Sequence, residues 1–210
     1  MTLFTKLYDL IMQPADQLLL KDLRERLVGQ ADGRVLEVGS GTGLNFPYYV
    51  PGLQVTALEP DDGLRNKSLS RMLRADAAIR VVAGEAEMLP FETDSFDTVV
   101  CTLVLCTVES QEEAIREIKR VLKPEGTLLL LEHVLPEDRT RKEWFMRAAP
   151  AWEKMCGGCR LDRPTGRMLC SHGFRPVVMR TFAKGLFIEM TAKPVTKLSQ
   201  ETRGFTEEIR

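Results

Sequence analysis

The most informative part of this sequence is Val35-Leu36-Glu37-Val38-Gly39-Ser40-Gly41-Thr42-Gly43, where an apolar strand leads directly into a turn that holds three glycines. Glycine adopts backbone torsion angles that other residues avoid and lets a ligand come close to the main chain. Between a strand and a helix, such a turn predicts a site for a nucleotide-like ligand at the carboxyl end of the strand. A tight turn without a ligand is the alternative interpretation.

Short aliphatic and β-branched runs alternate with helical patterns around this turn, which is typical of a parallel sheet covered by helices on both faces. We predict strands at residues 34–38, 54–59, 79–83, 98–101 and 126–133, and helices at 62–73 and 111–122. The second helix is expected to stop at Lys123-Pro124-Glu125-Gly126. Residues 175–182 and 186–193 predict a β-hairpin. The predicted fold is α/β, a doubly wound, mostly parallel sheet with a C-terminal antiparallel hairpin.

One domain is expected from 210 residues, because single α/β units often exceed the usual domain length. We expect it to cover residues 1–195, with an N-terminal helical lid segment at 1–30, a cap or crossover at 139–172 and a flexible tail at 196–210. Within the cap, the helical pattern is interrupted at Pro150, Gly157-Gly158 and Pro164. The tail is polar and has few apolar anchors, which favours fraying.

Composition narrows the classes of function. The formal net charge of −1 lacks the excess of Lys and Arg that nucleic-acid binding uses, so nucleic acid is not an expected partner. The longest aliphatic run, at residues 128–131, is far below the ~20 residues that span a bilayer. Asp9 and Pro14 are unlike a signal peptide, and five cysteines suit a reducing compartment. A cytoplasmic location is expected.

The glycine spacing discriminates between ligands. A dinucleotide fingerprint, G-x-G-x-x-G, needs its third glycine at position 44, but that residue is Leu44 and the third glycine is Gly43. Glu59 follows the next strand, about 20 residues on, where a carboxylate can accept hydrogen bonds from both hydroxyls of a ribose. A solvated acid at the end of a strand is the alternative for Glu59.

Four sequence motifs, taken in their order along the chain, resemble those of one protein family. They are VLEVGSGTGLNFPYY at 35–49, ALEP at 57–60, GEAEMLPFETDSFDTVV at 84–100 and REIKRVLKPEGTLLLLEH at 116–133. Together they resemble class I S-adenosylmethionine-dependent methyltransferases with a Rossmann-like fold, in the branch of the ubiquinone and menaquinone C-methyltransferases. The resemblance covers about residues 30 to 135.

Within that branch, residues 101–134 are most similar to the animal methyltransferase-like proteins that methylate alkyl thiols. The bacterial relatives include phospholipid N-methyltransferases. Trp152, Cys156-Gly157-Gly158-Cys159 and Asp162-Arg163 are loosely similar to the thiol-methylating group as well. The animal proteins carry a hydrophobic N-terminal anchor, whereas this chain begins near the domain, so no transmembrane anchor is expected and peripheral membrane contact stays open.

The resemblance implies S-adenosyl-L-methionine as cofactor and assigns residues to it. Glu37 would hold its methionine end, directly or through water, beside a turn made permissive by Gly39, Gly41 and Gly43. Glu59 would bind the ribose. Glu85, where many relatives have Asp, would accept from the adenine amino group, with the Ala86 N–H facing the ring, and the Cys101 carbonyl would receive the cofactor's amino group.

His133 is the candidate catalytic base, because it ends the fifth predicted strand on the ligand side of the sheet. A neutral imidazole can take a thiol proton at physiological pH, although a histidine that only shapes the pocket is an equal alternative. Five aromatic residues could cover an acceptor or simply pack in the core. They are Phe4, Tyr8, Trp144, Phe145 and Trp152.

Cys156-Gly157-Gly158-Cys159 invites a metal or a redox interpretation. A zinc site would need Cys170 and His172, whose single intervening residue departs from finger spacing. A redox motif would open a helix after a strand, which this one does not. We therefore expect no metal, and we expect the two cysteines to line a pocket or pack.

The predicted function is S-adenosylmethionine-dependent methyl transfer to a small lipophilic acceptor, with a thiol favoured by the resemblance. A quinone C-methyltransferase and a phospholipid N-methyltransferase are alternatives within the class. A nicotinamide-dependent oxidoreductase is opposed by Leu44, and a non-catalytic cofactor-binding protein is opposed by Glu37, Glu59 and Glu85. The sequence favours no particular oligomeric state.

Overall fold

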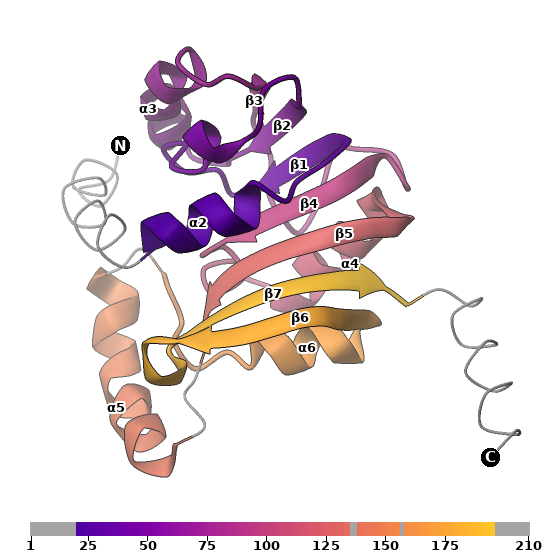
Figure 1. Cartoon of the computed structure of the whole chain (residues 1–210). Coiled ribbons are helices and arrows are strands. Elements are labelled where there is room, and N and C mark those ends of the chain that lie inside the picture. Colours follow the sequence, from indigo (N-terminus) through magenta and orange to yellow (C-terminus); the bar gives the residue numbers. More distant parts are fainter. Residues whose placement is uncertain (1–19, 135–137, 156–157, 196–210) are drawn as a thin grey trace, which may run out of the picture.

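A seven-stranded sheet with the order β3-β2-β1-β4-β5-β7-β6 forms the centre of the molecule (Figure 1). The computed structural model describes residues 20–134, 138–155 and 158–195. The strands are β1 (Arg34–Val38), β2 (Gln54–Leu58), β3 (Ala78–Val82), β4 (Phe96–Thr102), β5 (Leu122–His133), β6 (Phe174–Phe182) and β7 (Phe187–Pro194). The first five pair in parallel, and β7 is antiparallel to both β5 and β6. The predicted fold class is confirmed.

Helices cover both faces of this sheet. They are α2 (Lys21–Val28), α3 (Asp62–Met72), α4 (Gln111–Val121), α5 (Arg139–Met155) and α6 (Thr165–Ser171), with short 3-10 turns η2 (Phe46–Tyr48) and η3 (Ala183–Gly185). Leu27 of α2 shares one buried cluster with Val35, whereas Ile118 of α4 shares the other with Leu36. Successive strand residues point to opposite faces, and both faces of β1 are buried after the exposed Arg34, so Val35 to Val38 are apolar apart from Glu37.

Side-chain hydrogen bonds cap the N-termini of helices α3 and α4 and thereby fix where each helix begins. The Leu64 N–H donates to Asp61 Oδ1 at 2.8 Å before α3, and the Glu113 N–H donates to Ser110 Oγ at 3.3 Å before α4. Each acceptor satisfies one amide that the first helical turn leaves unpaired.

Most boundaries differ from the sequence prediction by one or two residues, and one differs by four. Helix α4 ends at Val121, one residue before its predicted end, and β5 begins at Leu122 instead of residue 126, because Leu122 already pairs with Phe96 before the register shifts to Thr127 opposite Thr98. Pro150 was expected to interrupt the cap, yet it lies inside α5. Proline removes one backbone donor without preventing the rest of a 17-residue helix from forming.

The C-terminal hairpin matches its prediction. Its turn has positive φ angles at Ala183, Lys184 and Gly185, of 47°, 60° and 88°. The predicted tail at 196–210 and most of the predicted lid, including Phe4 and Tyr8, lie outside the described residues. Among the helices that the structure does describe, none has the length and apolar content to cross a membrane.

Candidate active site

A cavity of about 760 Å³ opens at the carboxyl ends of the central strands. Gly39 and Gly41 line it after β1, Glu59 after β2, Thr102 at the end of β4 and His133 at the end of β5. This is the edge where open α/β sheets bind their ligands. The strand order separates Glu59 from His133 by three strand spacings, about 14 Å. We call the two regions the glycine end and the histidine end.

The glycine turn is shaped for a ligand. Gly39, Gly41 and Gly43 all have positive φ angles, of 66°, 55° and 79°. A Cβ atom at Gly39 would lie 2.5 Å from Val104, and one at Gly43 would lie 2.6 Å from the Phe46 ring, so both glycines are required by packing. A Cβ at Gly41 would meet nothing within 4 Å, because this residue faces the open cavity.

The hydroxyl of Ser40, in the same turn, is a buried side-chain group without a hydrogen-bond partner among the described residues. Buried polar groups in native proteins are nearly always paired, so an unpaired one indicates a missing partner. Ser40 itself does not line the cavity, whose wall at this turn is formed by Gly39 and Gly41.

Glu59 connects β2 to the glycine turn. Its carboxylate accepts from the Gly41 N–H at 2.9 Å and from the Asp61 N–H at 3.0 Å. Burial raises the pKa of the Glu59 carboxyl, while these two amides oppose the rise. A carboxylate has about four accepting positions, so each oxygen can still accept from a ligand hydroxyl.

Glu37 lies behind the turn instead of in the cavity wall. The Asn45 amide donates to its Oε1 at 2.9 Å and the Tyr49 hydroxyl donates to its Oε2 at 2.8 Å. Burial raises the pKa of the Glu37 carboxyl to about 7. The Arg24 guanidinium extends the network by donating to Asn45 Oδ1 at 2.8 Å and to Thr102 Oγ1 at 2.9 Å. Arg24, Asn45 and Tyr49 could not be singled out from the sequence, because they meet only in the folded chain.

Of the remaining residues predicted to contact the cofactor, two line the cavity and one lies in the protein core. Glu85 and Ala86 line the cavity on the loop after β3. Cys101 is fully buried inside β4, and the next two residues, Thr102 and Leu103, line the cavity instead.

The charge of the cavity wall indicates what kind of ligand it can bind. Six acidic residues line the wall, and they are Glu59, Asp61, Glu85, Glu87, Glu109 and Glu113. Neither Lys nor Arg occurs among the described lining residues. A wall of one sign attracts ligands of the opposite sign, so this cavity suits a cationic sulfonium and disfavours the pyrophosphate of a nicotinamide dinucleotide.

At the histidine end, aromatic rings surround the candidate base. The His133 ring centroid lies 4.4 Å from that of Phe187 and 6.2 Å from that of Trp152. His133 Nδ1 lies 3.5 Å from the Cys159 sulfur. Trp152 lines the cavity, which is one of the two positions considered for the aromatic residues. Phe145 packs against the buried Cys106 and Cys159.

Glu132, beside His133, was missed by the sequence analysis. Its buried carboxylate accepts from the N–H groups of Val104 and Leu105 at 2.7 and 2.8 Å, and from that of Cys106 at 3.3 Å. Burial raises the pKa of this carboxyl to about 7, and the bound amides oppose the rise. Glu132 thereby holds the loop after β4, where Leu103 has a positive φ of 58°. An acid next to a histidine at a strand end was the available signal.

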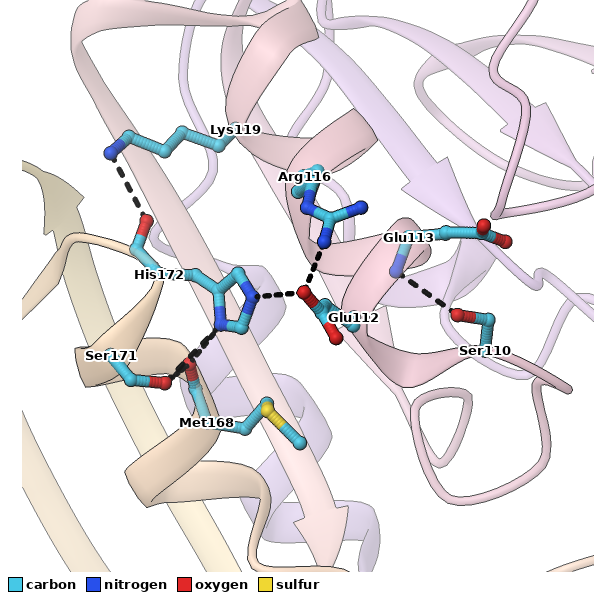
Figure 2. A network of polar contacts seen from close by, with 8 residues as sticks. All are labelled: Ser110, Glu112, Glu113, Arg116, Lys119, Met168, Ser171 and His172. Carbon is cyan, nitrogen blue, oxygen red and sulfur yellow. Dashed lines mark hydrogen bonds and ion pairs between the residues drawn. The ribbon is translucent and has the colours of Figure 1, made fainter.

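The cysteines do not group as the zinc hypothesis required. Cys159 lies 3.5 Å from Cys106, sulfur to sulfur, and Cys170 is exposed. His172 lies between α6 and α4, with Nδ1 2.9 Å from the Met168 carbonyl oxygen and Nε2 3.5 Å from Glu112, as Figure 2 shows. It therefore links two helices and lies away from Cys159. Cys156 is outside the described residues.

A parallel sheet with a glycine turn after β1, an acid after β2 and an acidic cavity at this edge agrees with the resemblance to class I S-adenosylmethionine-dependent methyltransferases. Comparison with known proteins agrees. The family model of a methyltransferase domain matches residues 36–130. Human thiol S-methyltransferase TMT1A is 36% identical over 170 residues, which are 79% of this chain and 70% of that protein. The chain belongs to the S-adenosylmethionine-dependent methyltransferase family.

Two further comparisons agree with this family. Demethylmenaquinone methyltransferase from Renibacterium salmoninarum is 38% identical over 130 residues, which are 59% of this chain and 53% of that protein. A solved structure described as an S-adenosylmethionine-dependent methyltransferase from Thermotoga maritima has a TM-score of 0.66 and 18% identity, and it covers 90% of this chain and 97% of that chain. The structural likeness shows a shared fold. The methyl acceptors that appear in the names of these proteins are known for the relatives.

Proposed function

We propose that this methyltransferase methylates the sulfur of a small, apolar thiol bound at the histidine end of the cavity. The observation that carries the proposal is the position of His133, whose ring lines the cavity among Phe187, Trp152 and Cys159. An apolar thiol would find aromatic surface and a proton acceptor in one place. The similarity to TMT1A supports the same acceptor class.

The glycine end would hold S-adenosylmethionine, which supplies an electrophilic methyl group on a sulfonium. Gly41 offers open backbone, Glu59 the ribose acceptors, and Glu85 with the Ala86 N–H the adenine contacts. Glu37 supports the turn through Asn45 and Tyr49, and a contact to the methionine end through water belongs to the same proposal. The Cys101 carbonyl, to which the resemblance assigned the amino group, belongs to a residue that does not line the cavity, so it is not part of this proposal.

His133 would remove the proton of the thiol while the cavity walls align the sulfur. Alignment of two bound reactants can be worth ~7–11 kcal/mol of the barrier, so no nucleophile of the protein is needed. The acidic wall disfavours a phosphate-bearing acceptor such as a phospholipid head group. The cytoplasmic location expected from the sequence remains part of this proposal.

A screen of acceptors tests the proposal. With S-adenosylmethionine as donor, small alkyl and aryl thiols should give S-adenosylhomocysteine faster than matched amines, phenols and quinols of similar size. Product formation is measured with and without acceptor, to subtract uncatalysed hydrolysis. If a quinol is methylated faster than every thiol, the proposed acceptor class is wrong and a quinone-type acceptor takes its place.

Ligand-induced stabilisation tests the cofactor separately. At a concentration 100 times its Kd, S-adenosylhomocysteine should stabilise the fold by about 2.7 kcal/mol and raise Tm by about 5–10 °C, because it binds only the native state. NAD at the same concentration should leave Tm unchanged, since its phosphates meet an acidic wall. A rise with NAD and none with S-adenosylhomocysteine would contradict the cofactor assignment.

A further inference from the structure

Two cysteines from distant parts of the chain meet at the histidine end. Cys106 follows β4 and Cys159 precedes α6, and both line the cavity. Their sulfur atoms are 3.5 Å apart. A disulfide bond is about 2.05 Å long, so a movement of about 1.5 Å would join them.

Hydrogen bonds to the main chain fix these two segments together. The Arg160 N–H donates to the Cys106 carbonyl at 2.7 Å. The Arg163 guanidinium donates to the carbonyls of Leu105 at 2.6 Å and Val108 at 2.5 Å. The two segments that carry the cysteines are therefore held together by one main-chain hydrogen bond and by the side chain of Arg163.

The two thiols are chemically unequal. Cys106 and His133, both within 3.5 Å, hold the pKa of the Cys159 thiol below its usual range. The contact with Cys159 and burial raise the pKa of Cys106. The thiolate is the attacking form of cysteine, so Cys159 is the nucleophile of the pair and Cys106 the resolving thiol.

We propose that Cys106 and Cys159 form a thiol–disulfide exchange site that takes small apolar disulfides from the cavity. The Cys159 thiolate attacks one sulfur of the disulfide, a bond to Cys159 forms, the original S–S bond breaks and one thiolate leaves. Cys106 then gives up its proton and attacks the Cys159 sulfur, and the second half leaves as a thiol. Two electrons pass from the protein thiols to the small disulfide, which becomes two thiols.

A metal ion is the competing occupant, because Cys106, His133 and Cys159 place three ligand atoms within 4.8 Å of one another. Zinc–sulfur bonds of about 2.3 Å in a tetrahedral site hold two sulfurs about 3.8 Å apart. The observed separation of 3.5 Å is shorter and favours direct contact between the sulfurs.

The site goes beyond methyl transfer and does not require it. Where the proposed function also holds, the exchange has a further consequence. A disulfide is the oxidised form of a thiol acceptor, so its reduction would release the acceptor thiol beside His133. That consequence alone rests on the proposed function.

The experiment uses the reduced full-length chain, diethyl disulfide as probe and no methyl donor. Peptide mapping by mass spectrometry should show a Cys106–Cys159 linkage and the loss of two protein thiols. In Cys106→Ser the resolving step is removed, so an ethylthio group should remain on Cys159. Cys170→Ser, which changes an exposed cysteine outside the cavity, should still form the linkage. A phosphine should reverse the reaction without adding a thiol.

Several results would overturn the proposal. These are a Cys156–Cys159 linkage, ethylthio adducts on other cysteines with Cys159 unmodified, or no reaction. Zinc that co-purifies at one ion per chain and is lost in Cys106→Ser would assign the cluster to a metal. If Cys106→Ser fails to fold, the peptide map of the unaltered chain still decides. Because no methyl donor is present, these outcomes are independent of the acceptor screen.

Discussion

His133→Ala should lower the rate of methyl transfer to a high-pKa thiol by ~10²–10⁴, since a positioned base contributes about that factor. The ring lines the cavity at the histidine end, about 14 Å across the sheet from Glu59, so cofactor affinity should stay nearly unchanged. The rate is measured under saturating S-adenosylmethionine, and cofactor affinity by calorimetry with S-adenosylhomocysteine.

The acidity of the acceptor separates base catalysis from pocket shape. An acidic thiol is already ionised to the thiolate in solution, so the rate of its methylation should fall only slightly in His133→Ala. For the high-pKa thiol, the loss should shrink as pH rises, because the thiolate then forms in solution. His172→Ala, the matched control on α6, should keep the full rate with both thiols. Equal losses for both thiols with the same pH profile would leave His133 a packing residue.

Glu59→Gln should weaken cofactor binding at least about tenfold, because charged hydrogen bonds are worth ~1.5–3 kcal/mol each. The variant keeps the shape of Glu59 and loses the charge facing a ribose. Its amide group also turns a donor toward the N–H of Gly41 or Asp61, so the glycine turn loses one acceptor. Isothermal titration with S-adenosylhomocysteine measures the change.

The control for this variant is Glu92→Gln, which changes an exposed acid that does not line the cavity. Its affinity should match that of the unaltered chain. The Tm of ligand-free Glu59→Gln shows whether the turn itself has been lost. Unchanged affinity with an intact fold would mean that the ribose is held by other residues.

The cavity residues after β1, β2 and β3 could be predicted because each follows a strand within a few positions. Gly39, Gly41 and Glu59 lie in the wall where local sequence placed them, and Glu85 and Ala86, which the family resemblance singled out, line it as well. Glu37 departs from this pattern, since its carboxylate contacts Asn45 and Tyr49 behind the wall. The direction of a side chain within a strand depends on what packs on each face, which one sequence does not state.

The zinc and redox interpretations of Cys156 and Cys159 took their partners only from residues 156–172. The partner of Cys159 is Cys106, 53 positions away, and the two meet because Arg160 and Arg163 bind the loop after β4. No spacing rule relates these residues. For Glu132 the sequence offers only an acid beside His133, since its role appears when the amides of residues 104–106 converge on its carboxylate.

The individual strands and the glycine turn could be predicted from the sequence. They follow from hydrophobic periodicity and from glycine torsion angles, which act over a few residues. The histidine end became visible only in three dimensions, because His133, Cys106, Cys159 and Trp152 come from four separate segments. Their meeting is set by long-range packing and backbone hydrogen bonds, whose energies depend on distances in space and not on positions along the chain.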